Sequence, residues 1–186
     1  MKKFFSLLVV CLLATMLCQA EKREFRGIDY ANVEQNIDLD TCNVYIVPTV
    51  LADVNAKKKK SLDKQEAAFK ELGATVQKEL KSSFKKATYQ VIENRKDAPA
   101  GAVVIEATLK EIDWGVATTK DVFFGAAAEV WGSYNVRVTN GNGLVLEYDN
   151  RRRHNTSLSD NPVGIIRTYN EVMAEDLISI LKKIKE

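Results

Sequence analysis

The sequence predicts an α+β domain in which two helices pack on one face of a mostly antiparallel sheet. From Ser61 to Ala87, apolar residues recur mostly every three or four positions, the period of an amphipathic helix. Several other segments alternate apolar and polar residues, as half-buried strands do. A last helix is predicted after Thr168. Because both helices are apolar on one side only, the simplest architecture lays them on the same face of a sheet.

The first strand of the domain is predicted from Val44 to Leu51, where the residues are apolar and mostly β-branched. Pro48 cannot donate a hydrogen bond to a neighbouring strand, so we expect an edge position or a bulge after the first half of this strand. The helix over 61–87 follows. Gly73 lies inside it and costs about 1 kcal/mol relative to alanine.

Antiparallel strands are predicted next. Tyr89 to Ile92 forms a short strand, and Val103 to Lys110 alternates apolar and polar residues. A strand from about Ala127 to Thr139 and its partner, Leu144 to about Thr156, form a hairpin. The four residues between them, Asn140 to Gly143, supply the positive backbone angles that a tight hairpin needs.

The last helix is expected to begin with a capping box of Thr168 and Glu171, after Asn161 and Pro162 end the strands. Its apolar stripe consists of Met173, Leu177, Ile180, Leu181 and Ile184. The predicted order is therefore strand, long helix, antiparallel strands and C-terminal helix.

The first twenty residues have the features of a secretory signal peptide. Lys2 and Lys3 precede a mostly apolar run from Phe4 to Leu17, which is shorter than the roughly 20 residues of a transmembrane helix. Small residues suit cleavage between Ala20 and Glu21. We therefore expect an exported, periplasmic or envelope-associated protein. Its parts are a signal peptide (1–20), an N-terminal arm (21–42) and a single α+β domain (43–186).

Cys18 offers an alternative, which is anchoring in a membrane through a lipid. A lipoprotein signal has a small residue directly before the cysteine, and this chain has Leu17 there. Cleavage after Ala20 is therefore favoured over lipidation. Cys42 is then the only cysteine that remains, which excludes an internal disulfide and favours a small buried residue over a nucleophile.

Charge disfavours nucleic acid as a partner. The first twenty residues hold two lysines and no acid, so residues 21–186 carry 25 basic and 25 acidic side chains. A general binder of polyanions would have a basic excess. The basic run Lys57 to Lys60 is interpreted as a solvated loop, with contact to an anionic surface as the alternative.

The sequence lacks the parts of common catalytic and metal sites. His154 is the only histidine, and the chain has no GxSxG elbow, phosphate loop or HExxH helix. Gly141 and Gly143 belong to a turn rather than to a dinucleotide fingerprint. We expect a non-enzymatic protein without a cofactor or metal. A hydrolase that uses two carboxylates stays open as an alternative, because acids distant in sequence can meet in space.

The strand alternation predicts two tryptophans on the sheet face that the helices leave uncovered. Trp114 shares that face with Ile112. If the hairpin holds its register, Arg151 and Arg153 lie on the same face, whereas Arg152 and His154 point to the other. The predicted partner-binding surface consists of Trp114, Trp131, Arg137, Arg151 and Arg153. The alternative is that the N-terminal arm, the loop 115–121 or a second copy of the chain covers this face.

Three segments resemble bacterial families of small secreted envelope proteins and lipoproteins of unknown function. They are APAGAVVIEATLKEIDWG (98–115), FFGAAAEVWGSYNVRV (123–138) and TNGNGLVLEY (139–148). The resemblance implies a small α+β domain and carries over no catalytic residues. The expected partner is an envelope protein or a cell-wall or lipid component. A carrier of a small hydrophobic ligand, held between sheet and helices, is the alternative.

Overall fold

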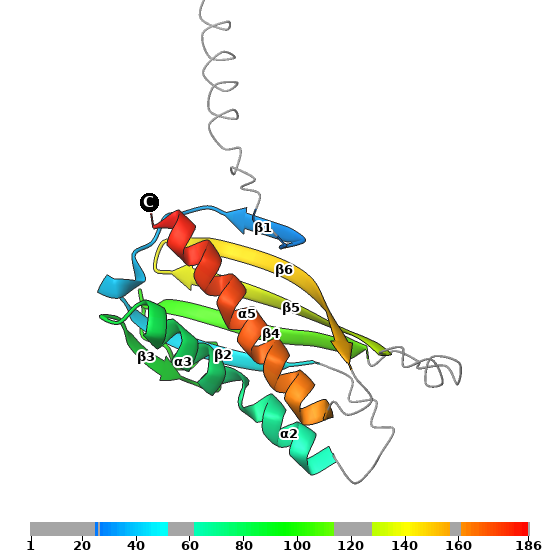
Figure 1. Ribbon diagram of the computed structural model, residues 1–186. Helices are drawn as coiled ribbons and strands as arrows, with labels where there is room; N and C mark the ends of the chain where they lie inside the picture. The colour runs from blue at the N-terminus through cyan, green and yellow to red at the C-terminus, as the bar shows by residue number, and fades with distance from the viewer. Residues whose placement is uncertain (1–24, 26, 52–61, 114–127, 157–160, 186) are drawn as a thin grey trace, which may run out of the picture.

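The computed structural model describes residues 25, 27–51, 62–113, 128–156 and 161–185 (Figure 1). The predictions for Cys18, for Ala20 and Glu21, for Lys57 to Lys60 and for Trp114 fall outside these residues. The strands are β1 (Tyr30–Val33), β2 (Asn43–Val50), β3 (Thr88–Val91), β4 (Val103–Asp113), β5 (Ala128–Asn140) and β6 (Gly143–Thr156). The helices are η1 (Leu39–Thr41), α2 (Leu62–Lys70), α3 (Leu72–Ser83), η3 (Arg95–Asp97) and α5 (Pro162–Ile184).

The described strands form a single sheet in the order β1-β6-β5-β4-β2-β3. Pairings β1–β6, β6–β5 and β5–β4 are antiparallel, whereas β2 is parallel to both β3 and β4. The α+β prediction with a mostly antiparallel sheet is therefore confirmed. The pairing of β3 with β2 ends at Ile46, so beyond that residue one edge of β2 has no described strand beside it. Pro48 lies in this unpaired part, which suits a residue that has no backbone N–H to donate.

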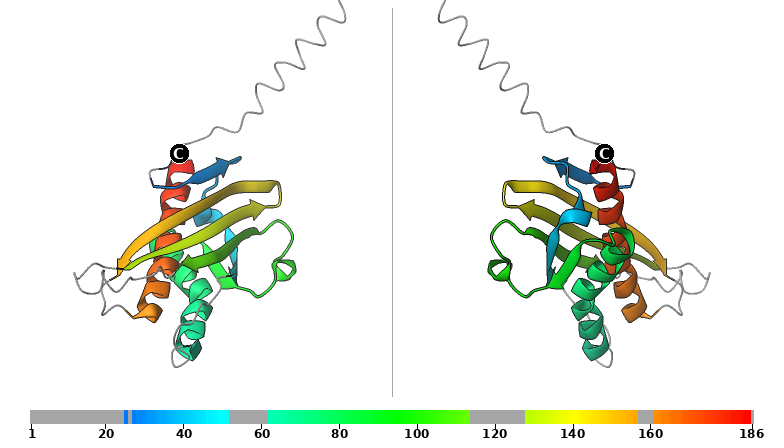
Figure 2. Two further views of the ribbon diagram at one scale, coloured as in Figure 1. Left: turned by 90° about the vertical axis from the view of Figure 1, so that its right-hand side faces the viewer. Right: turned by 90° about the vertical axis from the view of Figure 1, so that its left-hand side faces the viewer.

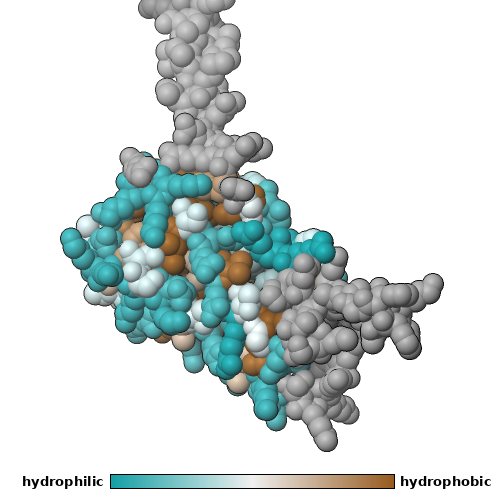
Figure 3. Space-filling model, viewed as in Figure 1, coloured by the Kyte–Doolittle hydropathy of each residue, from teal (hydrophilic) through white to brown (hydrophobic). Residues whose placement is uncertain are grey.

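The helices cover one face of the sheet, with α5 crossing the strands and α2 and α3 beside it (Figure 1). Apolar side chains from both layers fill the space between them. The largest fully buried ones include Leu72, Leu80, Ile105, Leu109, Tyr134, Tyr148, Ile166 and Met173. The outer surface over the helices is mainly hydrophilic, with small separate hydrophobic areas (Figure 3). None of the described helices is both long and apolar enough to span a membrane.

The first long helix is confirmed but interrupted between α2 and α3, at Glu71. Gly73 lies just after this interruption, where a Cβ would come 2.8 Å from Val91 Cγ1 and 2.9 Å from Pro48 Cγ. The glycine therefore lets the start of α3 lie directly on strands β2 and β3. This close packing offsets the low helix propensity that the sequence predicts for it.

The predicted start of the last helix is wrong. Helix α5 begins at Pro162, and the Asn161 side chain caps it by accepting a hydrogen bond from the backbone N–H of Val163. Proline is favoured at the first helical position because it has no N–H to leave unsatisfied. Thr168 lies inside the helix, and its hydroxyl donates to the carbonyl of Gly164.

The range 21–42, which the sequence analysis treats as an arm, contains strand β1 and the short helix η1. Tyr30 to Val33 pair with Asp149 to Leu146 at one edge of the sheet. Leu39 in η1 is 1% exposed and belongs to the core. This segment therefore contributes both to the sheet and to the core.

Among the described residues, the cover on the sheet face opposite the helices lies at one end only. A small apolar cluster of Val47, Ile92 and Val104 lies there, with Tyr45 and Ala98 against it. Figure 2 shows the loop that contains η3 on the side of the sheet away from the helices. The rest of this face, over β4, β5 and β6, has no described helix or loop upon it, and we call it the open face.

Candidate functional site

Trp131 lies on the open face, half-buried, in the middle of three paired strands. Its partners across the ladder are Asp113 on β4 and Arg153 on β6. The guanidinium of Arg151 lies over the indole, 5.0 Å from the ring centroid, which is a cation–π arrangement. The register therefore brings Trp131, Arg151 and Arg153 together as the sequence predicted.

Arg137 lies on the same face but farther along β5. It is exposed and sits between two acidic partners across the ladder, Glu106 on β4 and Glu147 on β6. Two registered pairs separate it from Trp131 on the same face, at Ser133 and Asn135. Arg137 therefore lies on the predicted surface but too far along β5 to contact Trp131.

The assignment of Ile112 to the open face is wrong. A bulge between Leu109 and Glu111 shifts the register of β4 by one residue. Ile112 consequently points to the helices and is 4% exposed within the core, while Glu111 and Asp113 are exposed. A bulge adds one residue to a strand and so reverses the alternation beyond it.

The remainder of the open face is lined by charges that pair with one another. Lys110 binds the carboxylate of Asp149. Arg95, from the η3 loop, binds Glu106 at 2.6 Å and also donates to the Thr139 hydroxyl at 3.0 Å. Surface pairs of this kind contribute little stability, so they mainly fix the pattern of charge that a partner meets.

A second polar cluster, which the sequence analysis missed, lies on the other side of the same strands. The Asp176 carboxylate from α5 accepts hydrogen bonds from the Tyr134 hydroxyl, from Asn150 Nδ2 at 2.7 Å and from Arg152 Nη2 at 2.7 Å. We call these four residues the buried polar cluster. Asp176 is 8% exposed and Asn150 3%.

Burial and charge act together on the tyrosines of this region. Desolvation raises the pKa of Tyr134 far above its ordinary value, and the neighbouring Asp176 carboxylate raises it further. Burial likewise raises the pKa of Tyr148, whose hydroxyl donates to the Met173 carbonyl at 2.9 Å. Both hydroxyls therefore stay protonated as hydrogen-bond donors and cannot act as bases at neutral pH.

Two signals in the sequence pointed to this cluster. The alternation already places Arg152 on the helix side, where a charged group needs a partner. Asp176 also lies directly before Leu177 in the apolar stripe of the last helix. The pairing of Arg152 with Asp176 depends on how α5 crosses the sheet. Neither the strand alternation nor the apolar stripe of the helix specifies that crossing.

The buried polar cluster is also tied to the segment before β1. Asn150 Nδ2 donates to the Gly27 carbonyl at 2.9 Å, and Gly27 has a positive φ of 78°. The backbone N–H of Arg151 donates to Asp29 Oδ2 at 2.8 Å. The part of β6 that presents Arg151 and Arg153 is therefore held from both sides, by α5 and by residues 27–29.

The remaining candidates show no catalytic arrangement. Cys42 is half-buried, and its thiol donates to the Asp38 carbonyl at 3.3 Å beside an open hollow of about 370 Å³. Among the described residues, no group of three or more histidine, cysteine or acidic side chains is placed to hold a metal ion. His154 lies within β6, opposite Val130.

Comparison with known proteins gives a likeness of fold. No family model matches the chain, and no curated protein matches it. The PelC dodecamer from Paraburkholderia phytofirmans is 8% identical, with a TM-score of 0.48 over 79% of this chain and 95% of that one. Rare lipoprotein B from Shewanella oneidensis is 9% identical, with a TM-score of 0.39 over 77% of this chain and 100% of the other.

Lipoprotein GNA1162 from Neisseria meningitidis is 16% identical, with a TM-score of 0.32 over 73% of this chain and 97% of its own. Two of these three structures carry the word lipoprotein in their names. At such identities and TM-scores the likeness is one of general architecture.

Proposed function

We propose that this chain is a non-enzymatic, exported envelope protein that binds a protein partner through the open face. The observation that carries the proposal is the half-buried Trp131 under the Arg151 guanidinium, on a part of the sheet that no described helix or loop covers. Tryptophan and arginine are the residue types most enriched among the strongest contributors to binding energy at protein interfaces.

The surroundings of Trp131 favour a protein partner over a purely apolar one. Charged residues of both signs line the face, and several of them already pair with one another, as Lys110 does with Asp149. Such a surface selects a partner by complementary charge around a small aromatic centre. A lipid tail would instead require a continuous apolar area.

The enzymatic alternative has little support in the chemistry of the acidic side chains. Asp38 and Asp40 both bind Lys185, at 3.0 and 3.2 Å. The backbone N–H of Lys86 and the Lys185 ammonium hold the pKa of Asp40 below its ordinary value. A carboxyl that acts as a general acid needs the opposite shift, so Asp40 is not suited to that role.

The ligand-carrier alternative has one specific observation in its favour. An open cleft of about 470 Å³ lies between β2 and α2, lined by Pro48, Val50 and Phe69, with charged residues at its rim. Its apolar lining suits a small hydrophobic molecule. Native mass spectrometry of the purified protein, with Phe69→Ala as the comparison, would show such a ligand as an added mass that the variant does not retain.

The main proposal is tested by affinity capture from envelope extract, followed by a binding measurement with the captured protein. We expect Trp131→Ala to weaken binding at least tenfold, since truncating an interface anchor costs about 2 kcal/mol or more. Arg151→Gln should weaken binding less than Trp131→Ala does, and Trp131→Phe should retain part of the affinity.

Glu175→Ala is the matched control, because Glu175 is exposed on α5, the helix that covers the opposite face of the sheet (Figure 1). It should bind like the wild type. Thermal unfolding of each variant separates lost binding from lost folding. A folded Trp131→Ala variant that still captures the same partner with unchanged affinity would refute the proposal.

A further inference from the structure

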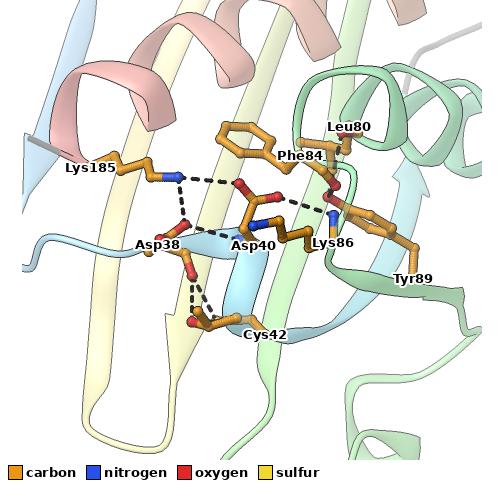
Figure 4. Close-up of polar contacts among 9 residues, drawn as sticks. Asp38, Asp40, Cys42, Leu80, Phe84, Lys86, Tyr89 and Lys185 are labelled. Atoms are coloured by element: carbon orange, nitrogen blue, oxygen red, sulfur yellow. Dashed lines mark hydrogen bonds and ion pairs between the residues drawn. The ribbon is translucent and has the colours of Figure 1, made fainter.

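Six exposed lysines gather where the helices α3 and α5 end. They are Lys81, Lys85, Lys86, Lys182, Lys183 and Lys185, and we call this set the lysine end. Asp40 links the end of α3 to the end of α5. The Lys86 backbone N–H donates to its Oδ1 at 3.2 Å, and Lys185 Nζ binds its Oδ2 at 3.2 Å (Figure 4). Figure 1 shows both helix ends at the same side of the molecule.

The lysine end carries a local excess of positive charge. Asp38 and Asp40 are the acids that Lys185 binds there, and Glu186 follows it in the sequence, so six lysines against three acidic side chains leave three positive charges. Residues 21–186 together carry equal numbers of acidic and basic side chains. The rest of that length is therefore negative by the same amount, and the protein has a strong charge asymmetry.

The helix dipole accounts for only part of this cluster. Lysines in the last turn of a helix interact favourably with its negative end, which applies to Lys182 and Lys183. Lys85 and Lys86 come after the last residue of α3, in the turn that leads to β3. Lys81 is in the last turn of α3 as well, so Lys85 and Lys86 are the exposed charges of this set that neither helix termination nor pairing with Asp38 and Asp40 explains.

The start of the described chain lies at the same end. Phe25 is 6% exposed, and the Lys183 ammonium lies over its ring, 5.1 Å from the centroid. In the sequence, seven residues separate Phe25 from the apolar run that ends at Leu17. Seven residues span at most about 25 Å. Before cleavage, or when anchored through Cys18 as in the alternative to cleavage, the chain would hold the lysine end close to the bilayer.

We infer that the lysine end docks on the surface of an anionic lipid bilayer. Each lysine near such a surface adds roughly a fivefold gain in partition. The lysine end lies at the ends of the helices and not on the open face, so docking leaves the open face accessible to a partner. This second surface does not depend on the function proposed for the open face.

Sedimentation with lipid vesicles tests the inference, using the full chain. The vesicles contain phosphatidylcholine alone or mixed with phosphatidylglycerol, each at low and at high salt. We expect binding to the anionic vesicles that weakens with salt. The triple variant Lys81→Gln, Lys182→Gln and Lys183→Gln should weaken that binding by about a hundredfold, from roughly fivefold for each lysine.

The matched control removes three exposed lysines elsewhere, with Lys64→Gln, Lys70→Gln and Lys96→Gln. It changes the net charge equally and should retain most of the binding. Equal losses in both triples would mean attraction by net charge alone and would overturn the inference. Equal binding of all proteins to phosphatidylcholine would assign the interaction to the apolar run, and no binding to anionic vesicles would also overturn it.

Discussion

Replacing Asp176 with alanine is expected to destabilise the protein by about 2–4 kcal/mol, because two buried donors and a guanidinium whose side chain is 35% exposed lose their shared acceptor. Asp176 is 8% exposed, and three donors converge on its carboxylate. The substitution leaves the Tyr134 hydroxyl, Asn150 Nδ2 and the Arg152 guanidinium without that acceptor. Unsatisfied donors of this kind keep their full desolvation cost.

Urea unfolding, followed by circular dichroism, measures this effect. Glu175→Ala is the control because Glu175 is the exposed neighbour on α5, and it should change the free energy of unfolding by less than about 0.5 kcal/mol. Adding Arg152→Met to an Asp176→Leu variant should recover part of the loss, since no buried charge then remains unpaired. A loss below about 1 kcal/mol for Asp176→Ala would contradict the central role of the buried polar cluster.

The second large effect is expected at Gly132, which pairs with Ile112 and Arg152 on the helix side of β5. A Cβ at this position would lie 2.5 Å from Cε1 of the Tyr169 ring. That ring cannot move aside easily, because it is 2% exposed and its hydroxyl donates to the Val130 carbonyl at 2.8 Å. Gly132→Ala should therefore cost about 2–3 kcal/mol, and Gly132→Val more, as overpacking does in a filled core.

The matched control for this prediction is Gly164→Ala in α5. A Cβ there meets nothing within 4 Å, and alanine is favoured over glycine in a helix by about 1 kcal/mol. The control should leave the melting temperature unchanged or raise it. If Gly132→Ala were as stable as the wild type, the close contact between α5 and β5 would not exist as described.

The strand alternation was sufficient to predict the fold class, and it placed Arg151 and Arg153 on one face of their strand. The register that sets them beside Trp131 depends on a bulge between Val138 and Thr139, because the turn at Asn140 to Gly143 alone would pair Trp131 with Arg152. Prediction failed where one extra residue changed the pattern. The bulge before Glu111 turned Ile112 to the core, and no local feature of β4 distinguishes that strand from a regular one.

Long-range choices were the other limit. The parallel pairing of β2 with β4 depends on the helix pair α2–α3 that crosses between them, and apolar strands do not specify their neighbours. Strand β1 is only four residues long, which is too short for periodicity to reveal it. The start of α5 was misplaced because Asn161 and Pro162 match both a strand end and a helix start.

Binding of a partner to the open face is tested most directly by site-specific photocrosslinking. A benzophenone amino acid is placed at Ser133, which lies on the open face opposite Arg151, and in a second variant at Glu175, on the outer surface of α5. After irradiation in envelope extract, we predict a crosslinked partner from position 133 and none from position 175. A partner crosslinked from position 175 alone would contradict the claim.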